Sequence, residues 1–230
     1  MNPRVKRPLA DLGIRLISGA FMAAGALVTA WLGGVVLIAV WLALAAFVLA
    51  EWWRITRGWP LWQAFGLVYA AIVLVVPLTL RWSGEFGLPA LLWLFAVVWT
   101  SDVMAYVCGR LIGGPKLWPR VSPGKTWAGF IGGTLFAGVA ATGVAAGAGV
   151  PSLLPVALVS VVAAMISQGG DLFESAVKRA FGVKDAGAVI PGHGGVMDRL
   201  DGFIAAGLFA LVLGVMRGGW EAAGQGVLIW

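Results

Sequence analysis

The run LLWLFAVVWTSDVMAYVCG, from Leu91 to Gly109, contains a single charged residue, Asp102. About 20 mostly apolar residues are enough for a helix to cross the hydrocarbon core of a bilayer. The composition of the whole chain agrees, because 60% of its 230 residues are hydrophobic and 11% are charged, whereas about 25% of the residues in a soluble domain are charged. The sequence therefore predicts an integral membrane protein.

Similar apolar runs recur along the chain, and they are continuous rather than alternating with polar residues, which argues against a membrane β-barrel. The runs are residues 12–31, 34–53, 61–80, 87–108, 127–148, 151–169 and 202–217. We expect an all-α fold, a polytopic bundle of about seven transmembrane helices. We divide it into generic N-terminal transmembrane helices, residues 1–98, and a catalytic transmembrane region with two polar loops, residues 99–230.

The 16 Lys and Arg residues are spread unevenly over the loops. If the seven runs are helices, only Arg81 and Arg217 fall on one side of the membrane. Because Lys and Arg are enriched in cytoplasmic loops, we expect a multi-pass protein of the inner (cell) membrane, with its N-terminus and both polar loops in the cytoplasm. The net charge of +6 then suits anionic lipid headgroups, so the bilayer, and not nucleic acid, is the expected partner.

The ten acidic residues fall into three sets, and five of them lie between residues 171 and 201. Four lie at the ends of apolar runs, where solvated side chains are expected: Asp11, Glu51, Glu85 and Glu221. Asp102 lies within a run, where an acid costs about 2.5–3.5 kcal/mol on insertion scales and needs a partner or a water-filled cavity. Helical spacing aligns it with Tyr106 and Arg110. Asp102 is therefore predicted either to belong to a polar site or to make a structural contact with these two residues.

A second acidic segment is QGGDLFESAVKR, from Gln168 to Arg179. If the preceding run continues as a helix, four polar residues share one face, because side chains three and four positions apart are neighbours. These are Asp171, Glu174, Ser175 and Lys178. The segment is either half of a polar site or a helix end with ordinary ion pairs.

The segment IPGHGGVMDRLDG, from Ile190 to Gly202, combines glycines with the chain's only histidine, His193, and an Asp-Arg-x-Asp sequence. Glycines allow backbone N–H groups to approach a ligand closely, as phosphate-binding loops do. Asp198 and Asp201 point the same way if a helix begins there. Carboxylates beside basic residues are suited to Mg²⁺-dependent phosphate chemistry, because Mg²⁺ binds one or two carboxylates together with phosphate oxygens.

The segment VSPGKTWAGFIGG, from Val121 to Gly133, contains PGKT but is not a P-loop. A P-loop needs glycine where this chain has Pro119, and it follows a strand. We expect Ser122 to cap the next helix, whose N-terminus favours an anion. Lys125 then either contacts that anion or extends to the lipid interface.

Together these segments resemble the phosphatidate cytidylyltransferase, or CDP-diacylglycerol synthase, family. SAVKRAFGVKDAGAVIPGHGGVMDRLD, from Ser175 to Asp201, is similar to the family signature of Ser-x-apolar-Lys-Arg, Lys-Asp and His-Gly-Gly-apolar-x-Asp-Arg-apolar-Asp. GDLFES, SPGKTWAGFIGG and DVMAYVCGR also look like family segments in family order. The resemblance extends from about Trp99 to Gly207.

The resemblance implies transfer of a cytidylyl group from CTP to phosphatidic acid, by direct attack of the lipid phosphate on the α-phosphorus. It implies Mg²⁺ as cofactor, with a second cation possible. The expected metal ligands are Asp171 and Asp198, supported by Asp201, Glu174 and Asp102. The residues expected to bind phosphates or CTP are Ser122, Lys125, Thr126, Lys178, Arg179, Lys184, Gly194, Gly195 and Arg199. His193 is expected to orient the substrate or assist the leaving pyrophosphate. Asp171, Asp198, Lys125, Arg199 and His193 are the expected catalytic residues.

Other functions stay open at this point. A CTP-dependent polyprenol kinase, or transfer to a different lipid acceptor, would use the same polar segments. An ion-coupled transporter also has intramembrane acids, although here the acids cluster at one face. A CDP-alcohol phosphotransferase is excluded, because Ala206 stands where its motif needs arginine. The oligomeric state is open between a monomer and a homodimer.

Overall fold

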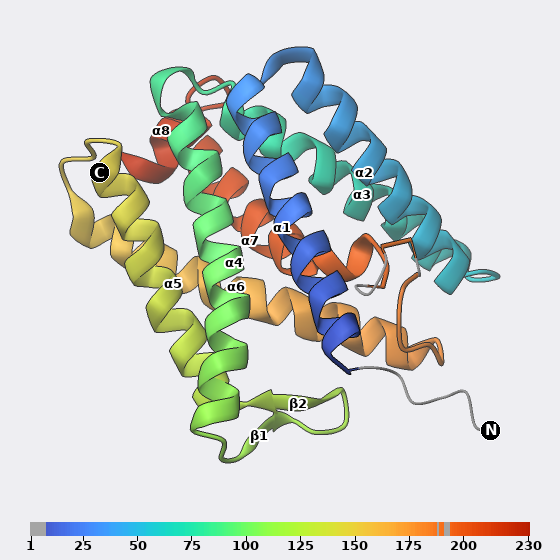
Figure 1. The fold of residues 1–230 in the computed structure, drawn as a ribbon. Coiled ribbons are helices and arrows are strands. Elements are labelled where there is room, and N and C mark those ends of the chain that lie inside the picture. Colours follow the sequence, from blue (N-terminus) through green and yellow to red (C-terminus); the bar gives the residue numbers. More distant parts are fainter. Residues whose placement is uncertain (1–7, 188, 191–193) are drawn as a thin grey trace, which may run out of the picture.

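The computed structural model describes residues 8–187, 189–190 and 194–230, with side chains from residue 17 onwards, and shows a bundle of helices (Figure 1). The long helices are α1 (Pro8–Leu32), α2 (Gly34–Ile55), α3 (Pro60–Arg81), α4 (Gly87–Leu111), α5 (Trp127–Gly147), α6 (Leu153–Ala180) and α7 (Met197–Gly218). The short helices are η1 (Gly84–Phe86) and α8 (Ala223–Leu228).

The expected bundle of membrane helices is confirmed. Six helices within the described residues, α2 to α7, are long and apolar enough to cross a membrane, and the described apolar part of α1 is the shorter segment Ile17–Leu32. Two boundaries differ from the expected runs. Helix α6 continues to Ala180 instead of ending at residue 169, and α7 begins at Met197 instead of residue 202. Both extensions consist of polar segments, so Asp171, Glu174, Asp198 and Asp201 lie on helices rather than on loops.

A β-hairpin between α4 and α5 was not predicted. Its strands are β1 (Lys116–Trp118) and β2 (Ser122–Thr126), which pair antiparallel. Such short strands show no alternating pattern, and Pro123 is tolerated because proline is accepted on edge strands. The expected cap Ser122 is wrong, since Ser122 begins β2. Thr126 caps α5 instead, with its hydroxyl accepting a hydrogen bond from the Gly129 N–H at 3.1 Å.

Glycines bring α4 close to α5. A Cβ atom at Gly129 would lie 2.6 Å from the carbonyl oxygen of Ala105, and one at Gly133 would lie 2.7 Å from that of Ser101. Small residues at such contacts allow helix backbones to approach in a membrane, where hydrophobic burial does not drive association. This contact fixes the hairpin beside the end of α4.

A second glycine contact joins α6 to α7. A Cβ atom at Gly170 would lie 2.7 Å from the carbonyl oxygen of Asp201, and one at Gly202 would lie 2.5 Å from the hydroxyl of Ser167. The polar segments at the end of α6 and the start of α7 therefore meet at one end of the bundle.

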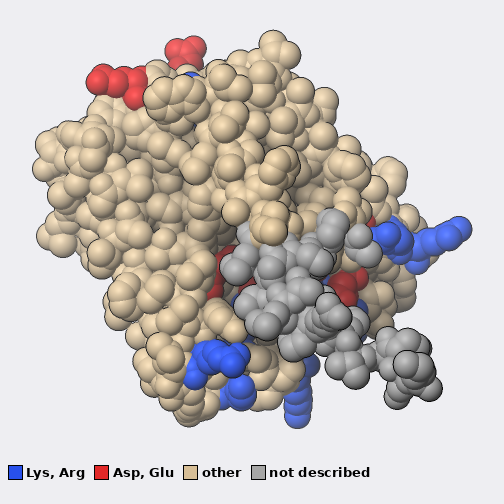
Figure 2. All heavy atoms as spheres, viewed as in Figure 1, with Lys and Arg blue, Asp and Glu red and all other residues tan. Residues whose placement is uncertain are grey.

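The two basic residues expected on the other side of the membrane lie at the opposite end of the bundle, where each binds a backbone carbonyl. Arg81 Nε donates to Ala30 O at 2.7 Å, and Arg217 donates to Gly226 O at 2.5 Å. Figure 2 shows other Lys and Arg side chains gathered around the hairpin and the end of α2. The basic residues are therefore concentrated at one end of the bundle, as the sequence predicts. The orientation of the bundle in the membrane stays a prediction.

The α4–α5 contact gives a stability test. Gly133→Ala should destabilise the bundle by about 1–3 kcal/mol, because the new methyl group overlaps the carbonyl of Ser101 and the helices must separate. The matched control is Gly143→Ala in the same helix, where a Cβ atom meets nothing within 4 Å. The measurement is thermal unfolding in detergent. Equal melting temperatures for the two variants would contradict the close contact.

Candidate active site

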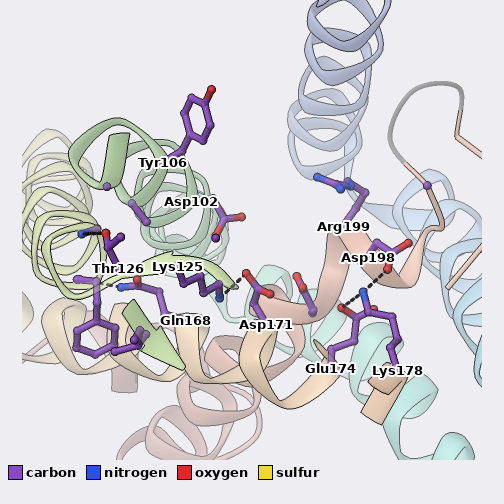
Figure 3. A pocket seen from close by; sticks show the side chains of 18 of the residues that line it. Asp102, Tyr106, Lys125, Thr126, Gln168, Asp171, Glu174, Lys178, Asp198 and Arg199 are labelled. Atoms are coloured by element: carbon purple, nitrogen blue, oxygen red, sulfur yellow. Dashed lines mark hydrogen bonds and ion pairs between the residues drawn. The ribbon is translucent and has the colours of Figure 1, made fainter. Parts of the chain in front are cut away.

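A cavity of about 1270 Å³ opens at the hairpin end of the bundle (Figure 3). It is larger than most pockets for a single small ligand, which measure about 300–1,000 Å³, so it has room for two substrates. It is lined by residues of α4, the hairpin, the start of α5, α6, the loop after α6 and α7. The expected site residues that line it are Asp102, Lys125, Thr126, Asp171, Glu174, Lys178, Lys184, Gly194, Asp198, Arg199 and Asp201.

The Asp198 carboxylate, in the first turn of α7, is held from three directions. Lys178 Nζ of α6 lies 2.6 Å from Oδ1, the Gly195 N–H donates to Oδ2 at 2.8 Å, and the Ala186 N–H donates at 3.1 Å. The side chain is 8% exposed. Hydrogen bonds to a charged group are stronger than neutral ones, so Asp198 has one fixed orientation.

Lys178 joins two helices through two carboxylates. Besides Asp198, its ammonium contacts Glu174 Oε2 at 3.0 Å, one turn earlier on α6. Glu174 is 1% exposed, and its other oxygen, Oε1, is buried without a hydrogen-bond partner in the described part of the chain. One ammonium therefore faces two carboxylates.

The hairpin contributes Lys125, whose ammonium lies 2.6 Å from Asp171 Oδ2 on α6. Both side chains are partly exposed to the cavity, and Ser175 donates to the other oxygen of Asp171 at 3.4 Å. Asp171, Glu174, Ser175 and Lys178 thus share one face of α6, as predicted. A partly exposed ion pair is weak, so a charged substrate can replace either partner.

Asp102 and Arg199 approach the cavity from different helices, α4 and α7, and point into the same space (Figure 3). The expected contact of Asp102 with its helix neighbours is not the one formed, since Arg110 instead donates to the Tyr106 hydroxyl at 3.2 Å. Asp201 accepts a hydrogen bond from the Gly202 N–H at 2.7 Å. The site interpretation of Asp102 is the one that this geometry favours.

Three expected site residues do not line the cavity. Ser122 lies at the far end of β2, Arg179 donates to the carbonyl of Val183 at 3.1 Å, and Gly195 is buried behind Asp198. His193 lies outside the described residues. The ligand contacts predicted for these four residues stay predictions.

Sequence reasoning missed Glu51 and Gln168. Glu51 of α2 was expected in solvent, yet it is 3% exposed and accepts hydrogen bonds from Val196 N–H and Met197 N–H at 3.1 and 2.8 Å. Gln168 donates to Thr134 Oγ1 at 2.9 Å, which joins α6 to α5 beside the cavity. No local pattern signals either contact, because the partners are 145 and 34 residues away.

The donor set suits a hard divalent cation. Within the described residues, no group of three or more His, Cys, Asp or Glu side chains is close enough to hold a metal by itself. Mg²⁺ usually binds one or two carboxylates and completes its coordination with substrate phosphates and water. Asp171, whose side chain is 32% exposed on the cavity wall, offers one such carboxylate.

Comparison with known proteins finds one family model and several relatives that carry the same name. The family model described as "Cytidylyltransferase family" matches residues 58–216. A phosphatidate cytidylyltransferase of Brucella abortus is 43% identical over 184 residues, which are 80% of this chain and 67% of that protein. One from Rickettsia bellii is 33% identical over 205 residues, 84% of this chain and 87% of that protein. One from Staphylococcus saprophyticus is 40% identical over 152 residues, 61% and 55% of the two chains.

The double contact of Lys178 gives a second stability test. Lys178→Met should cost about 3–5 kcal/mol of unfolding free energy, because it leaves two buried carboxylates without their cation. The exposed Lys116 of β1 provides the control, Lys116→Met, for which a change within about 0.5 kcal/mol is expected. Denaturant unfolding in detergent measures both. A Lys178→Met protein as stable as Lys116→Met would show that the ion pairs are not formed.

Proposed function

The chain belongs to the cytidylyltransferase family, and we propose that it transfers a cytidylyl group from CTP to phosphatidic acid, giving CDP-diacylglycerol and pyrophosphate. The observation that carries the proposal is the extent of the similarity. The family match of residues 58–216 includes the four lysines and all the carboxylates that line the cavity. The fold agrees, since it is a bundle of apolar helices with a polar cavity at one end.

The position of the cavity suits one lipid and one water-soluble substrate. On α4, Asp102 and Tyr106 line the cavity, while Val103 and Leu111 are 59% and 80% exposed on the apolar surface beside them. A lipid can keep its acyl chains against that surface while its phosphate enters the cavity. The charged CTP enters from the aqueous side.

In the reaction, an oxygen of the lipid phosphate attacks the α-phosphorus of CTP. The new P–O bond forms as the bond from the α-phosphorus to the β-phosphate oxygen breaks, and pyrophosphate leaves with that electron pair. The attacking phosphate is already ionised, so no base has to remove a proton. Catalysis then depends on positioning and charge neutralisation.

The cations of the cavity supply that neutralisation. Lys125 and Arg199 face the space where the two substrates meet, and Lys184 lines its rim. A substrate phosphate then replaces the Asp171 carboxylate beside Lys125, since both side chains line the cavity. Lys178 stays with Glu174 and Asp198 and keeps their carboxylates in place.

We propose Mg²⁺ as the cofactor, held principally by Asp171 and Asp198, with Glu174, Asp201 and Asp102 in support. The bound ion would supply positive charge to the phosphates. A second cation is a further expectation for so acidic a cavity.

We also propose that the protein lies in the inner membrane with this site in the cytoplasm, because the basic residues around the cavity are typical of cytoplasmic loops. A homodimer stays a prediction, which sedimentation in detergent tests.

The function is tested with purified protein, phosphatidic acid, CTP and Mg²⁺. We expect a CDP-lipid product from the wild type and a rate about 10- to 100-fold lower for Asp198→Asn, because the neutral side chain weakens both cation binding and the contact with Lys178. Glu221→Gln, exposed at the opposite end of the bundle, is the control and should keep the wild-type rate. Absence of CDP-lipid from active preparations of the wild type would contradict the proposal.

The cofactor is tested by its removal. Treatment with EDTA should abolish turnover, and added Mg²⁺ should restore it, because the carboxylates repel CTP phosphates when no cation lies between them. The rate is measured against the free Mg²⁺ concentration. Full activity in excess EDTA would show that lysine and arginine side chains suffice without a metal.

A further inference from the structure

We infer that the C-terminal end of α2 is a positioning element for the reaction: Glu51 holds the start of α7, Arg54 holds Ala186 in the connection between α6 and α7, and together they fix the direction of the Asp198 carboxylate. The inference rests on the proposed function for its kinetic consequence. Both residues precede residue 58, where the family match begins. They lie on a helix that contributes no residue to the cavity lining.

Glu51 binds the start of α7. Its Oε1 accepts from Val196 N–H at 3.1 Å and its Oε2 accepts from Met197 N–H at 2.8 Å, so each carboxylate oxygen holds one backbone amide. The first N–H groups of a helix have no partner within the helix, and they favour negative charge. Asp198 is the next residue, so the position of its backbone follows from this contact.

Arg54 binds Ala186, within the connection between α6 and α7. Its guanidinium donates to the carbonyl of Ala186, and the N–H of that same residue donates to Asp198 at 3.1 Å. The two contacts of α2 are therefore alike. Glu51 binds the N–H of Val196, which follows Gly195, and the N–H of Gly195 also donates to Asp198.

Two glycines show that the loop is fitted against Glu51. A Cβ atom at Gly195 would lie 2.7 Å from both carboxylate oxygens, and one at Gly187 would overlap Glu51 and lie 3.0 Å from Nη2 of Arg54. A side chain at either position would force Glu51 to move or the backbone to shift, so both glycines lie closely against a buried charged group.

Simple helix packing does not need this arrangement. Burying a carboxylate is costly unless its oxygens are satisfied, and an apolar side chain would join α2 to α7 without that cost. The Glu51 carboxylate fixes the orientation of the start of α7, because its two oxygens accept from the Val196 and Met197 N–H groups only when these groups lie in one position. Such a role is useful where the adjacent residue must be held within a fraction of an ångström for catalysis.

The test compares Glu51→Gln and Arg54→Met with two matched controls, Glu85→Gln and Arg57→Met, whose side chains are exposed. We expect Glu51→Gln to lower kcat about 10- to 100-fold, because its amide group presents an N–H to one backbone N–H. KM for CTP and for phosphatidic acid should stay near the wild-type values, since Glu51 touches neither substrate. Arg54→Met should act in the same direction with a smaller loss and a wild-type melting temperature.

A second arm uses Asp198→Asn as the background. If Glu51 acts through Asp198, adding Glu51→Gln to Asp198→Asn should cause little further loss of kcat, because coupled residues are not additive. Multiplicative losses would overturn the inference, as would a wild-type kcat in both Glu51→Gln and Arg54→Met. A loss that merely follows the fraction of folded protein would also overturn it.

Amide hydrogen exchange separates this inference from the proposed function. The N–H groups of Val196 and Met197 should exchange faster in Glu51→Gln than in the wild type or Glu85→Gln, whatever reaction the protein catalyses. Unchanged exchange would overturn the α2 contact itself. A wild type that makes no CDP-lipid but shows the exchange difference would overturn the proposed function alone.

Discussion

The ammonium of Lys178 lies between the carboxylates of Glu174 and Asp198, and the polar end of the bundle depends on this contact. It joins the end of α6 to the start of α7 through side chains that are 11% exposed or less, so loss of one partner leaves an uncompensated charge. The contact is possible because Gly170 and Gly202 allow the two helices to approach closely. With Lys178 engaged in this way, Lys125 and Arg199 are the cations that we propose to neutralise the substrate phosphates.

Helix length explains how an apolar bundle carries a charged site. Helix α6 has 28 residues, about 42 Å at 1.5 Å per residue, whereas the hydrocarbon core is about 30 Å thick. A helix of this length can cross the core and still carry its last turns, with Asp171, Glu174 and Lys178, to the edge of the apolar layer. The hairpin and the start of α7 meet them there. A lipid phosphate and a nucleotide can reach such a site from opposite sides without either crossing the membrane.

Much of this architecture could be predicted from the sequence. The length of the apolar runs predicts the long helices. The spacing of Asp171, Glu174 and Lys178 predicts their shared face, because it matches the period of a helix. The hairpin could not be predicted, since its strands are too short for a periodic signal and contain Pro123. Glu51 could not be recognised either, because it resembles an ordinary solvated helix end until α7 is brought against it. Asp102 could be identified as a site candidate because an acid within an apolar run is costly unless it has a partner or a water-filled cavity.

The central claim is that the cavity transfers the cytidylyl group itself, and the fate of individual phosphorus atoms tests it most directly. Wild-type protein is supplied with phosphatidic acid and CTP labelled at either the α- or the γ-phosphorus. We predict that the α-label enters the lipid and that the γ-label leaves as pyrophosphate. A lipid that carries the γ-label would show that the cavity catalyses phosphoryl transfer, as a CTP-dependent kinase does, and would contradict this account.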